Sequence, residues 1–395
     1  SGFGIWSLQY NTTGSENTAI GHRTLANNTT GTGNVGVGFY TAYANQTGNY
    51  NTSLGWKSLY SNTGSYNVAV GRNSLYDNTT GGFNTAIGTS SAQNVTTGNY
   101  NFAGGYTTLG ECTTCDNTTA IGHNALGQVT TADNNTAFGY EAATSNTSAT
   151  GTVAVGYRAL RNVTTGNSNV AMGSDALFTT TTGSSNTAIG HQSLTRNTTG
   201  TLNVGIGAFS LDNNTTGETN TAIGGYALND NTTGTNNVAI GYAALNGNTT
   251  GTYNISIGNS SSYSGNGNYN IGIGKWSLQN TSTSDNNIGI GYKAGQSSTQ
   301  GNVIFIGYEA GKSNTTGTAS MAVGHQALAS NTEGNYNSAF GYQGLTSNVD
   351  GDNNNASGYQ ALTSNTTGDN NTASGFEALK SNTTGSGSVA IGYEA

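Results

Sequence analysis

The chain has 395 residues, of which 61 are glycine, none is proline and only 7% are charged, with a formal net charge of −8. Disordered chains are usually rich in charge and proline, and collagen needs proline with glycine at every third position, so this composition excludes both. The sequence also lacks a basic region for nucleic acid, an apolar run of ~20 residues for a membrane span, and a signal-peptide pattern.

A tandem repeat of about 17 residues runs through the whole sequence. Twenty-four glycines close an apolar segment, from Gly4 to Gly392, and 20 of the 23 intervals between them are 17 residues long while three are 16. The consensus is N-T-A-I-G-x-x-A-L-x-x-N-T-T-G-x-x. We therefore expect residues 1–395 to form one continuous repeat array without an internal boundary, as a fragment of a longer fibre.

Each repeat is too short for a helix pair but fits one coil of a β-solenoid with two short strands and two bends. The T-A-I stretch, as at 187–189, is the first predicted strand, and the A-L stretch, as at 125–126, is the second. Glycine supplies the unusual backbone positions at both bends. The missing proline fits this fold because every amide would donate to the next coil. The predicted fold class is all-β, a solenoid of about 23 coils of 17 residues.

The first strand has large apolar residues around a small central one, which is Ala, Gly or Ser in 22 of 23 coils, with Phe305 the exception. Alternate residues of a strand point to opposite faces, so both faces would need cover. We expect a parallel homotrimer in which small residues allow close approach of the chains. The alternative is a single-chain solenoid whose narrow interior requires small residues. Coils in which Ser357 and Ser374 replace Ile should be looser than those around Ile240.

Two further columns of the repeat carry structural predictions. Leu stands four residues after the closing glycine in 17 of 23 coils, where it would form the core of the second strand. Asn stands four residues before that glycine in 18 of 23 coils, and identical amides one coil apart can form a hydrogen-bonded ladder. Examples of the predicted ladder are Asn17, Asn34, Asn51, Asn84 and Asn237.

Runs such as Asn186-Thr187-Ala188-Ile189-Gly190, repeated in every coil, resemble the head repeats of YadA-like trimeric autotransporter adhesins. They are even more similar to the N-T-A-I-G-x-x-A-L-x-x-N-T-T-G repeats of bacteriophage tail-fibre-type proteins. This resemblance implies a trimeric β-roll that serves as a stiff fibre or adhesin on a cell or virion surface. The adhesin repeat is shorter, and the stalk, membrane anchor and terminal domains of those families have no counterpart in this sequence.

The four histidines are the natural candidates for catalysis in a chain with so few ionisable groups. His22, His123, His191 and His325 each follow a closing glycine, at a position where Tyr140 and other tyrosines stand in other coils. They are coils apart, so no two can share a metal within one chain. Only three copies of one histidine around a trimer axis could form a site. We predict no catalytic residue, no metal and no cofactor.

The only two cysteines replace the Asn and the Gly of the N-T-T-G bend. Because the ends of a bend lie close together, Cys112 and Cys115 are predicted to form a local disulfide, as suits an oxidising exterior. A redox-active pair would need a helix N-terminus, and a zinc site would need four ligands.

The complete N-T-T-G motif occurs ten times, and each copy is an N-glycosylation sequon. Glycans at these bends would cover one edge of the rod, although Asn, Thr and Gly are also the residues that a tight bend requires. The candidate acceptors are Asn11, Asn28, Asn78, Asn197, Asn214, Asn231, Asn248, Asn314, Asn365 and Asn382.

The sequence thus predicts a non-enzymatic, extracellular fibre or adhesin shaft, exposed on a cell or virion surface, that acts as a spacer and a repetitive binding surface. Its expected partners are further copies of itself, sideways and end to end, and a host-surface glycan or receptor, with no nucleic acid and no membrane span. The alternative is a subunit of an extracellular filament or matrix, with or without a glycan coat.

Overall fold

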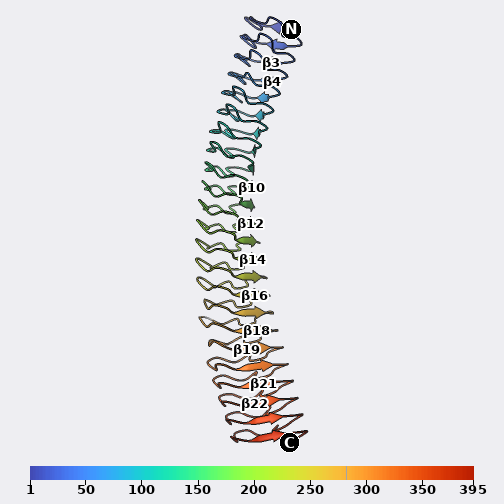
Figure 1. The fold of residues 1–395 in the computed structure, drawn as a ribbon, viewed down its shortest axis with the longest axis vertical. Helices are drawn as coiled ribbons and strands as arrows, with labels where there is room; N and C mark the ends of the chain where they lie inside the picture. Colours follow the sequence, from blue (N-terminus) through green and yellow to red (C-terminus); the bar gives the residue numbers. More distant parts are fainter. Residues whose placement is uncertain (282) are drawn as a thin grey trace. The chain divides into compact units, whose positions relative to one another are not determined.

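The computed structural model describes residues 1–281 and 283–395, which form two compact units, Ser1–Thr201 and Leu202–Ala395. Each unit is a parallel β-solenoid with one strand in each coil, and its described residues form no helix (Figure 1). The strands recur along the sequence at the spacing of the repeat. The predicted all-β solenoid of about 23 turns is therefore confirmed.

The strands of the first unit are β1 (Gly2–Phe3), β2 (Thr18–Ile20), β3 (Val35–Val37), β4 (Thr52–Leu54), β5 (Val68–Val70), β6 (Thr85–Ile87), β7 (Phe102–Gly104), β8 (Thr119–Ile121), β9 (Thr136–Phe138), β10 (Val153–Val155), β11 (Val170–Met172) and β12 (Thr187–Ile189). Those of the second unit are β13 (Val204–Ile206), β14 (Thr221–Ile223), β15 (Val238–Ile240), β16 (Ile255–Ile257), β17 (Ile271–Ile273), β18 (Ile288–Ile290), β19 (Ile304–Ile306), β20 (Met321–Val323), β21 (Ser338–Phe340), β22 (Asn355–Ser357), β23 (Thr372–Ser374) and β24 (Val389–Ile391).

Within each unit, consecutive strands pair in parallel and in constant register. Ala19 of β2 is opposite Gly36 of β3, and Ser53 of β4 is opposite Ala69 of β5, although the second pair spans one of the 16-residue intervals. The missing residue of that coil is absorbed at the bend. There Asn62 donates to the carbonyl of Gly64, two residues on, at 2.9 Å, whereas Asn78 donates three residues on to Gly81. Register is therefore set by the strands, and the bend takes up changes in repeat length.

The closing glycine is required by both conformation and space. Gly21 has φ +128°, and a Cβ added to it would collide with the carbonyl oxygen of Gly38 in the next coil. A residue with a side chain would be strained at this φ and would push the coils apart. This explains why glycine occupies the position in every repeat.

The segment after the closing glycine is not the second strand that the sequence predicts. It is a turn in which every other residue has a left-handed backbone, such as Arg23 (φ 54°) and Leu25 (φ 49°). Such a conformation costs about 1–2 kcal/mol for a residue with a side chain. It is offset by hydrogen bonds between coils, since the N–H of Leu25 donates to Thr41 at 3.0 Å and that of Arg23 to Ile5 at 3.0 Å. The ladder continues through the turn without a strand.

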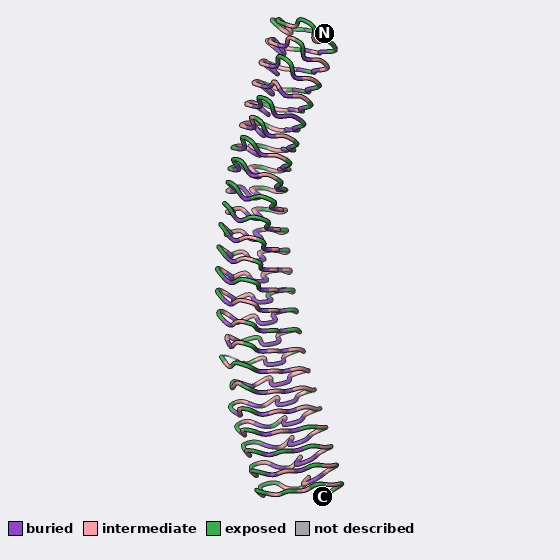
Figure 2. Tube along the Cα trace, in the orientation of Figure 1, coloured by how far each residue is buried: buried purple, intermediate pink, exposed green. Residues whose placement is uncertain are grey.

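Buried positions recur from coil to coil, among them the central residue of the strand and the Leu of the following turn (Figure 2). Leu25 is buried and reaches toward the strand of the next coil, where its Cγ lies 3.5 Å from the place that a Cβ on Gly36 would take. The small central residues, such as Ala19, are buried inside the same coil. The prediction that they mediate close approach between chains is therefore wrong. The narrow interior alone explains them.

Phe305, the exception to the small-residue rule, is buried because neighbouring coils make room for it. At the Leu position the adjacent coils carry Gly295 and Gly311 instead, and a Cβ on either would lie within 3 Å of the Phe305 ring. One large side chain from the strand thus replaces the side chains normally supplied by two turns.

The interior gives no reason for looser coils around Ser357 and Ser374, and that expectation stays a prediction for hydrogen exchange. Both serines point outward and are exposed, while their neighbours Ala356 and Ala373 stay buried and opposite each other in register. Replacing Ile by Ser at these positions removes no interior contact.

Candidate interaction surfaces

The outward side chains of the strands form an apolar band in each unit, which we call the strand stripe and define as the first and third residues of every strand. In β2 the buried Ala19 lies between Thr18 and Ile20, and Ile20 is 45% exposed. Leu54 in β4 and Phe138 in β9 are 47% and 53% exposed. Contiguous apolar surface of this kind marks an interaction site in soluble proteins.

The asparagines before each strand form the ladder that their spacing predicts. Asn34 donates from its backbone N–H and from Nδ2 to the Oδ1 of Asn17, at 2.9 and 3.2 Å. Its Nδ2 also donates to the carbonyl of Gly48 at 2.8 Å. The same bonds recur at Asn51 and at Asn237, and these side chains are buried. Because each amide bonds to the coil before it and to a bend carbonyl, the ladder joins the coils through their interior; Asn84 is a further member.

The asparagines of the N-T-T-G bends form a second ladder, which is a finding beyond the sequence predictions. Asn231 donates from Nδ2 to the Oδ1 of Asn214 at 2.8 Å and to the carbonyl of Gly234 at 3.1 Å. The signal in the sequence is one column of equal residues at the coil spacing, and the glycosylation sequon in the same column conceals it.

This second ladder contradicts the glycan hypothesis for most of the sequons. A glycan is attached to Nδ2, and in the folded coils that atom is engaged in hydrogen bonds inside a buried amide, so the coil has no room for the sugar. The buried acceptors are Asn28, Asn78, Asn197, Asn214, Asn231, Asn248, Asn314 and Asn365. Asn11 and Asn382 are only partly buried, but their Nδ2 atoms also donate to bend carbonyls.

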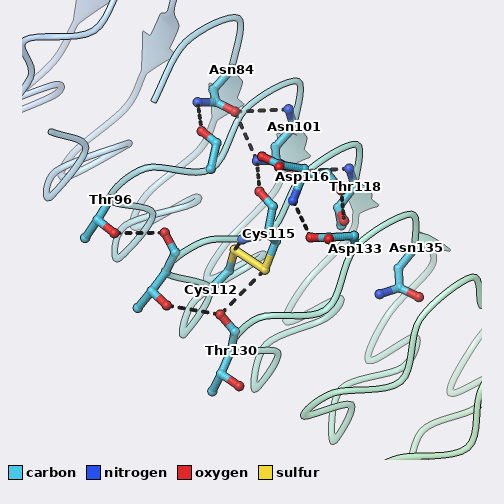
Figure 3. The surroundings of a disulfide bond; sticks show 12 residues. Asn84, Thr96, Asn101, Cys112, Cys115, Asp116, Thr118, Thr130, Asp133 and Asn135 are labelled. Carbon is cyan, nitrogen blue, oxygen red and sulfur yellow. Dashed lines mark hydrogen bonds between the residues drawn. A yellow bond between two sulfur atoms is a disulfide. The ribbon is translucent and has the colours of Figure 1, made fainter. Parts of the chain in front are cut away.

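Cys112 and Cys115 form a disulfide across one bend of the first unit, with 5.9 Å between their Cα atoms. Both are buried, and the carbonyl of Cys115 accepts a hydrogen bond from Asn101 at 2.7 Å, as the bend glycines do elsewhere (Figure 3). In the flanking coils the bend asparagine is replaced by Val95 and Val129. The disulfide thus lies where the second ladder is interrupted, and being buried it is not placed for redox exchange.

The histidine rings are members of exposed stacks of aromatic rings. The ring of His123 lies between Tyr106 and Tyr140, with centroid distances of 5.4 and 5.0 Å. His325 lies in the same way between Tyr308 and Tyr342, at 5.0 Å from each.

His22 is 5.3 Å from Phe39, and His191 occupies the equivalent repeat position. A separate stack runs through Tyr50, Tyr66, Phe83 and Tyr100. These rings support a structural role, because they stack coil on coil and leave their edges to solvent.

Surface carboxylates are mostly engaged with neighbouring coils. Arg158 contacts Asp175 at 2.9 Å and Arg161 contacts Glu141 at 2.7 Å. Burial raises the pKa of Glu309, but hydrogen bonds from Gln326 (3.2 Å) and Lys312 (3.1 Å) outweigh it and hold that pKa below its usual range. Glu309 is therefore stabilised as an anion.

A shallow polar hollow of about 390 Å³ lies beside the disulfide-bearing coil. It exists because Gly110 and Gly127 leave space between Gln93, Glu111 and Gln128. The only carboxylate among its lining residues is that of Glu111, and no aromatic ring lines it. Over residues 1–281 and 283–395 no three His, Cys, Asp or Glu side chains gather closely enough to hold a metal ion.

None of the described segments is a helix long and apolar enough to cross a membrane. Comparison with protein-family models and with curated proteins found no match to this chain. The side chains that distinguish it are therefore those of the strand stripe, the two asparagine ladders, the aromatic stacks and the disulfide.

Proposed function

We propose that this chain is a non-enzymatic shaft segment of an extracellular surface fibre or adhesin, in which three parallel copies pack along the strand stripe. The observation that carries the proposal is that nearly every strand has Ile, Val, Leu or Phe at an outward position, where these side chains are half-buried or exposed. Fully burying one such side chain is worth about 1.5–3 kcal/mol, and the stripe repeats this gain from coil to coil.

The period of the stripe favours a partner that itself repeats at the coil spacing. A surface that matches one apolar side chain per coil over many coils must itself repeat at the coil spacing, and a second copy of this chain in parallel orientation meets that condition. A closed ring of three copies would cover the stripe of each chain without leaving an open edge. The low charge and the disulfide are consistent with a location outside the cell.

As a shaft, the trimer would act as an elongated spacer and present the same surface side chains at every coil. Repeated weak contacts to a host-surface glycan or receptor would then add up to avid binding. The two interior ladders suit this role, because they link each coil to the next and resist bending between coils.

Light scattering and electron microscopy test this proposal. We expect a particle of three times the 40.1 kDa chain mass, seen as stiff rods of finite length. A monomer in solution would overturn the trimer. Indefinitely long filaments built only of these coils would favour the filament or matrix subunit instead.

A further inference from the structure

All three tryptophans of the chain lie against cations that form no ion pair with a carboxylate in the described part of the chain. Arg23 lies 4.6 Å from the centroid of Trp6, and Lys57 lies 4.6 Å from that of Trp56. Arg72 is 5.0 Å from Trp56. In the second unit Trp276 has two lysines, Lys275 at 4.0 Å and Lys293 at 5.3 Å. By contrast, Arg158, Arg161, Lys312 and Lys380 are each paired with a carboxylate.

The first of these groups is a continuous surface across five coils, which we call the cation–tryptophan patch. It consists of Trp6, Arg23, Tyr40, Trp56, Lys57, Tyr60, Arg72 and Tyr76. The members touch in sequence: Arg23 also lies 5.4 Å from Tyr40, and Lys57 lies 5.5 Å from Tyr60 and 5.9 Å from Tyr76. Tyr60 and Tyr76 stack at 5.0 Å.

This patch is positively charged, whereas the chain as a whole has a net negative charge. The chain carries 18 acidic and 10 basic residues, yet residues 1–76 contain three of the cations and a single acidic residue, Glu16. No described carboxylate lies within ion-pair distance of Arg23, Lys57 or Arg72. Trp6 and Trp56 remain 47% and 39% exposed. An exposed surface that combines unpaired cations with large aromatic rings suits a ligand that is both anionic and partly apolar.

The three cations also follow the direction in which the coils stack. Lys57 lies two coils beyond Arg23, and Arg72 one coil further, so they are spaced by roughly 10 and 5 Å along the stack. A linear polyanion could bind all three at once, whereas a small anion would meet only one.

We propose that the cation–tryptophan patch binds an acidic polysaccharide laid along the coils. The guanidinium and ammonium groups donate to its carboxylates or sulfates, and the C–H faces of its sugar rings pack on the exposed parts of the indole and phenol rings. This inference rests on the proposed role as an exposed binding rod, and it adds the class of ligand and the surface that binds it.

The same observations disfavour two other polyanionic surfaces. Nucleic acid binding that engages about 6–10 phosphates needs more cations than the three of this patch. An anionic membrane would gain about 1 kcal/mol from each of only three cations, too little for stable attachment.

Titration of the whole chain with polysaccharides, followed by tryptophan fluorescence and affinity electrophoresis, tests this proposal. The probes are polygalacturonate as a carboxylated chain, heparin as a sulfated chain and dextran as a neutral chain. We expect both acidic polymers to bind and dextran not to bind, with affinity that falls as salt rises. The stronger of the two acidic probes identifies the preferred anion.

The decisive variant is R23Q/K57Q/R72Q, with R158Q/R161Q/R196Q as a control that removes the same number of charges from the same unit. We expect the first to weaken binding about tenfold or more and the control to change it less than twofold. Circular dichroism of both variants verifies that the coils remain folded.

Equal binding by the two variants would overturn the proposal, as would binding of dextran. Preference for single-stranded DNA or for anionic lipid vesicles over both acidic polysaccharides would also overturn it. A trimeric rod that binds no acidic polymer refutes only the ligand, whereas a monomer that does bind one refutes only the trimer.

Discussion

Two regions of the second unit have the same kind of buried interior but differ in the outward residues of their strands. The outward positions of β16 to β19 are all isoleucine, whereas those of β22 and β23 are Asn355, Ser357, Thr372 and Ser374. In both regions the strands pair in the same register. The polar region shows that a coil closes without apolar residues on the strand stripe. The isoleucines of β16 to β19 therefore serve something other than the fold of the single coil, which is the argument for a covering partner.

Substitution inside the Ile-rich region should have the largest effect. Phe305→Ala removes a fully buried ring between two coils that carry glycine at the Leu position, so neither coil can fill the cavity. We expect a loss of about 3–5 kcal/mol, measured by chemical denaturation and by hydrogen exchange of the amides of β18 to β20. The outward neighbour provides the control, and Ile306→Ala should cost the isolated chain less than about 1 kcal/mol.

The repeat itself supplies a rescue of that cavity. Gly311 has φ +56°, the value at which Leu328 holds the same position one coil later, so Gly311→Leu adds only the cost of about 1–2 kcal/mol that the other left-handed residues of the turn already bear. Combined with Phe305→Ala it should recover at least half of the lost stability. Alone it should destabilise, because its side chain would meet the Phe305 ring. Additive losses in the double variant would contradict this account of the interior.

Breaking the interior ladder should have the next largest effect. Asn237→Ala deprives the backbone N–H and the Nδ2 of Asn254 of their acceptor, at 2.9 and 3.1 Å, in a buried site. Leaving such groups unsatisfied should cost about 2–3 kcal/mol, measured by denaturation. Thr233→Ala, at an exposed bend position of the preceding coil, is the control and should change stability by less than about 0.5 kcal/mol. Similar losses for both would mean that the ladder is not important.

The period of the sequence was sufficient to predict the solenoid, the strand and the first asparagine ladder. Each follows from a column of similar residues, such as Asn34 and Asn51, whose stacking needs no knowledge of the coil's shape. The face of the strand that points inward could not be obtained in this way. Alternation shows that Thr18 and Ile20 share one face and Ala19 takes the other, but only the volume inside the coil decides that the small residue is the buried one.

Two other errors have local causes. Nothing in the side chain of Leu25 signals a left-handed backbone, since that conformation is stabilised by hydrogen bonds to neighbouring coils. An apolar residue at this position therefore predicts a strand that the coil does not form. The bend asparagines carry a motif that is meaningful in isolated peptides, and the motif concealed their stacking. The cation–tryptophan contacts join residues at different positions of the repeat, so the repeat pattern does not predict them.

Exchanging the outward residues of the Ile-rich and polar regions tests whether another chain covers the strand stripe. Ile273→Ser with Ile290→Ser should weaken association at least tenfold, because apolar area buried against the neighbouring chains is lost. Ser357→Ile with Ser374→Ile should strengthen association by extending the strand stripe. Sedimentation over a dilution series measures both changes. The stability of the coils themselves should stay within about 1 kcal/mol, and equal association in the two variants would argue against packing along the stripe.

The disulfide should give the smallest effect, because it closes a bend that two asparagine ladders already hold elsewhere. The chain-entropy estimate for so short a loop is about 2 kcal/mol at most. Cys112→Asn with Cys115→Gly restores the ordinary bend, in which Asn78 donates to Gly81 at 2.9 Å. We expect this variant to lie within about 1 kcal/mol of the oxidised chain.

Replacing both cysteines by alanine should cost more, since it provides neither the covalent link nor the amide. Even the variant with Asn and Gly should not recover the full stability of the oxidised chain, because Val95 and Val129 in the flanking coils cannot accept the hydrogen bond that a ladder amide donates. Hydrogen exchange at Thr113 resolves these small differences, as its N–H donates to Thr130 at 3.0 Å across the bend. If the Asn and Gly variant were as weak as the alanine variant, the bend would depend on the covalent bond and not on the amide that the cysteines replace.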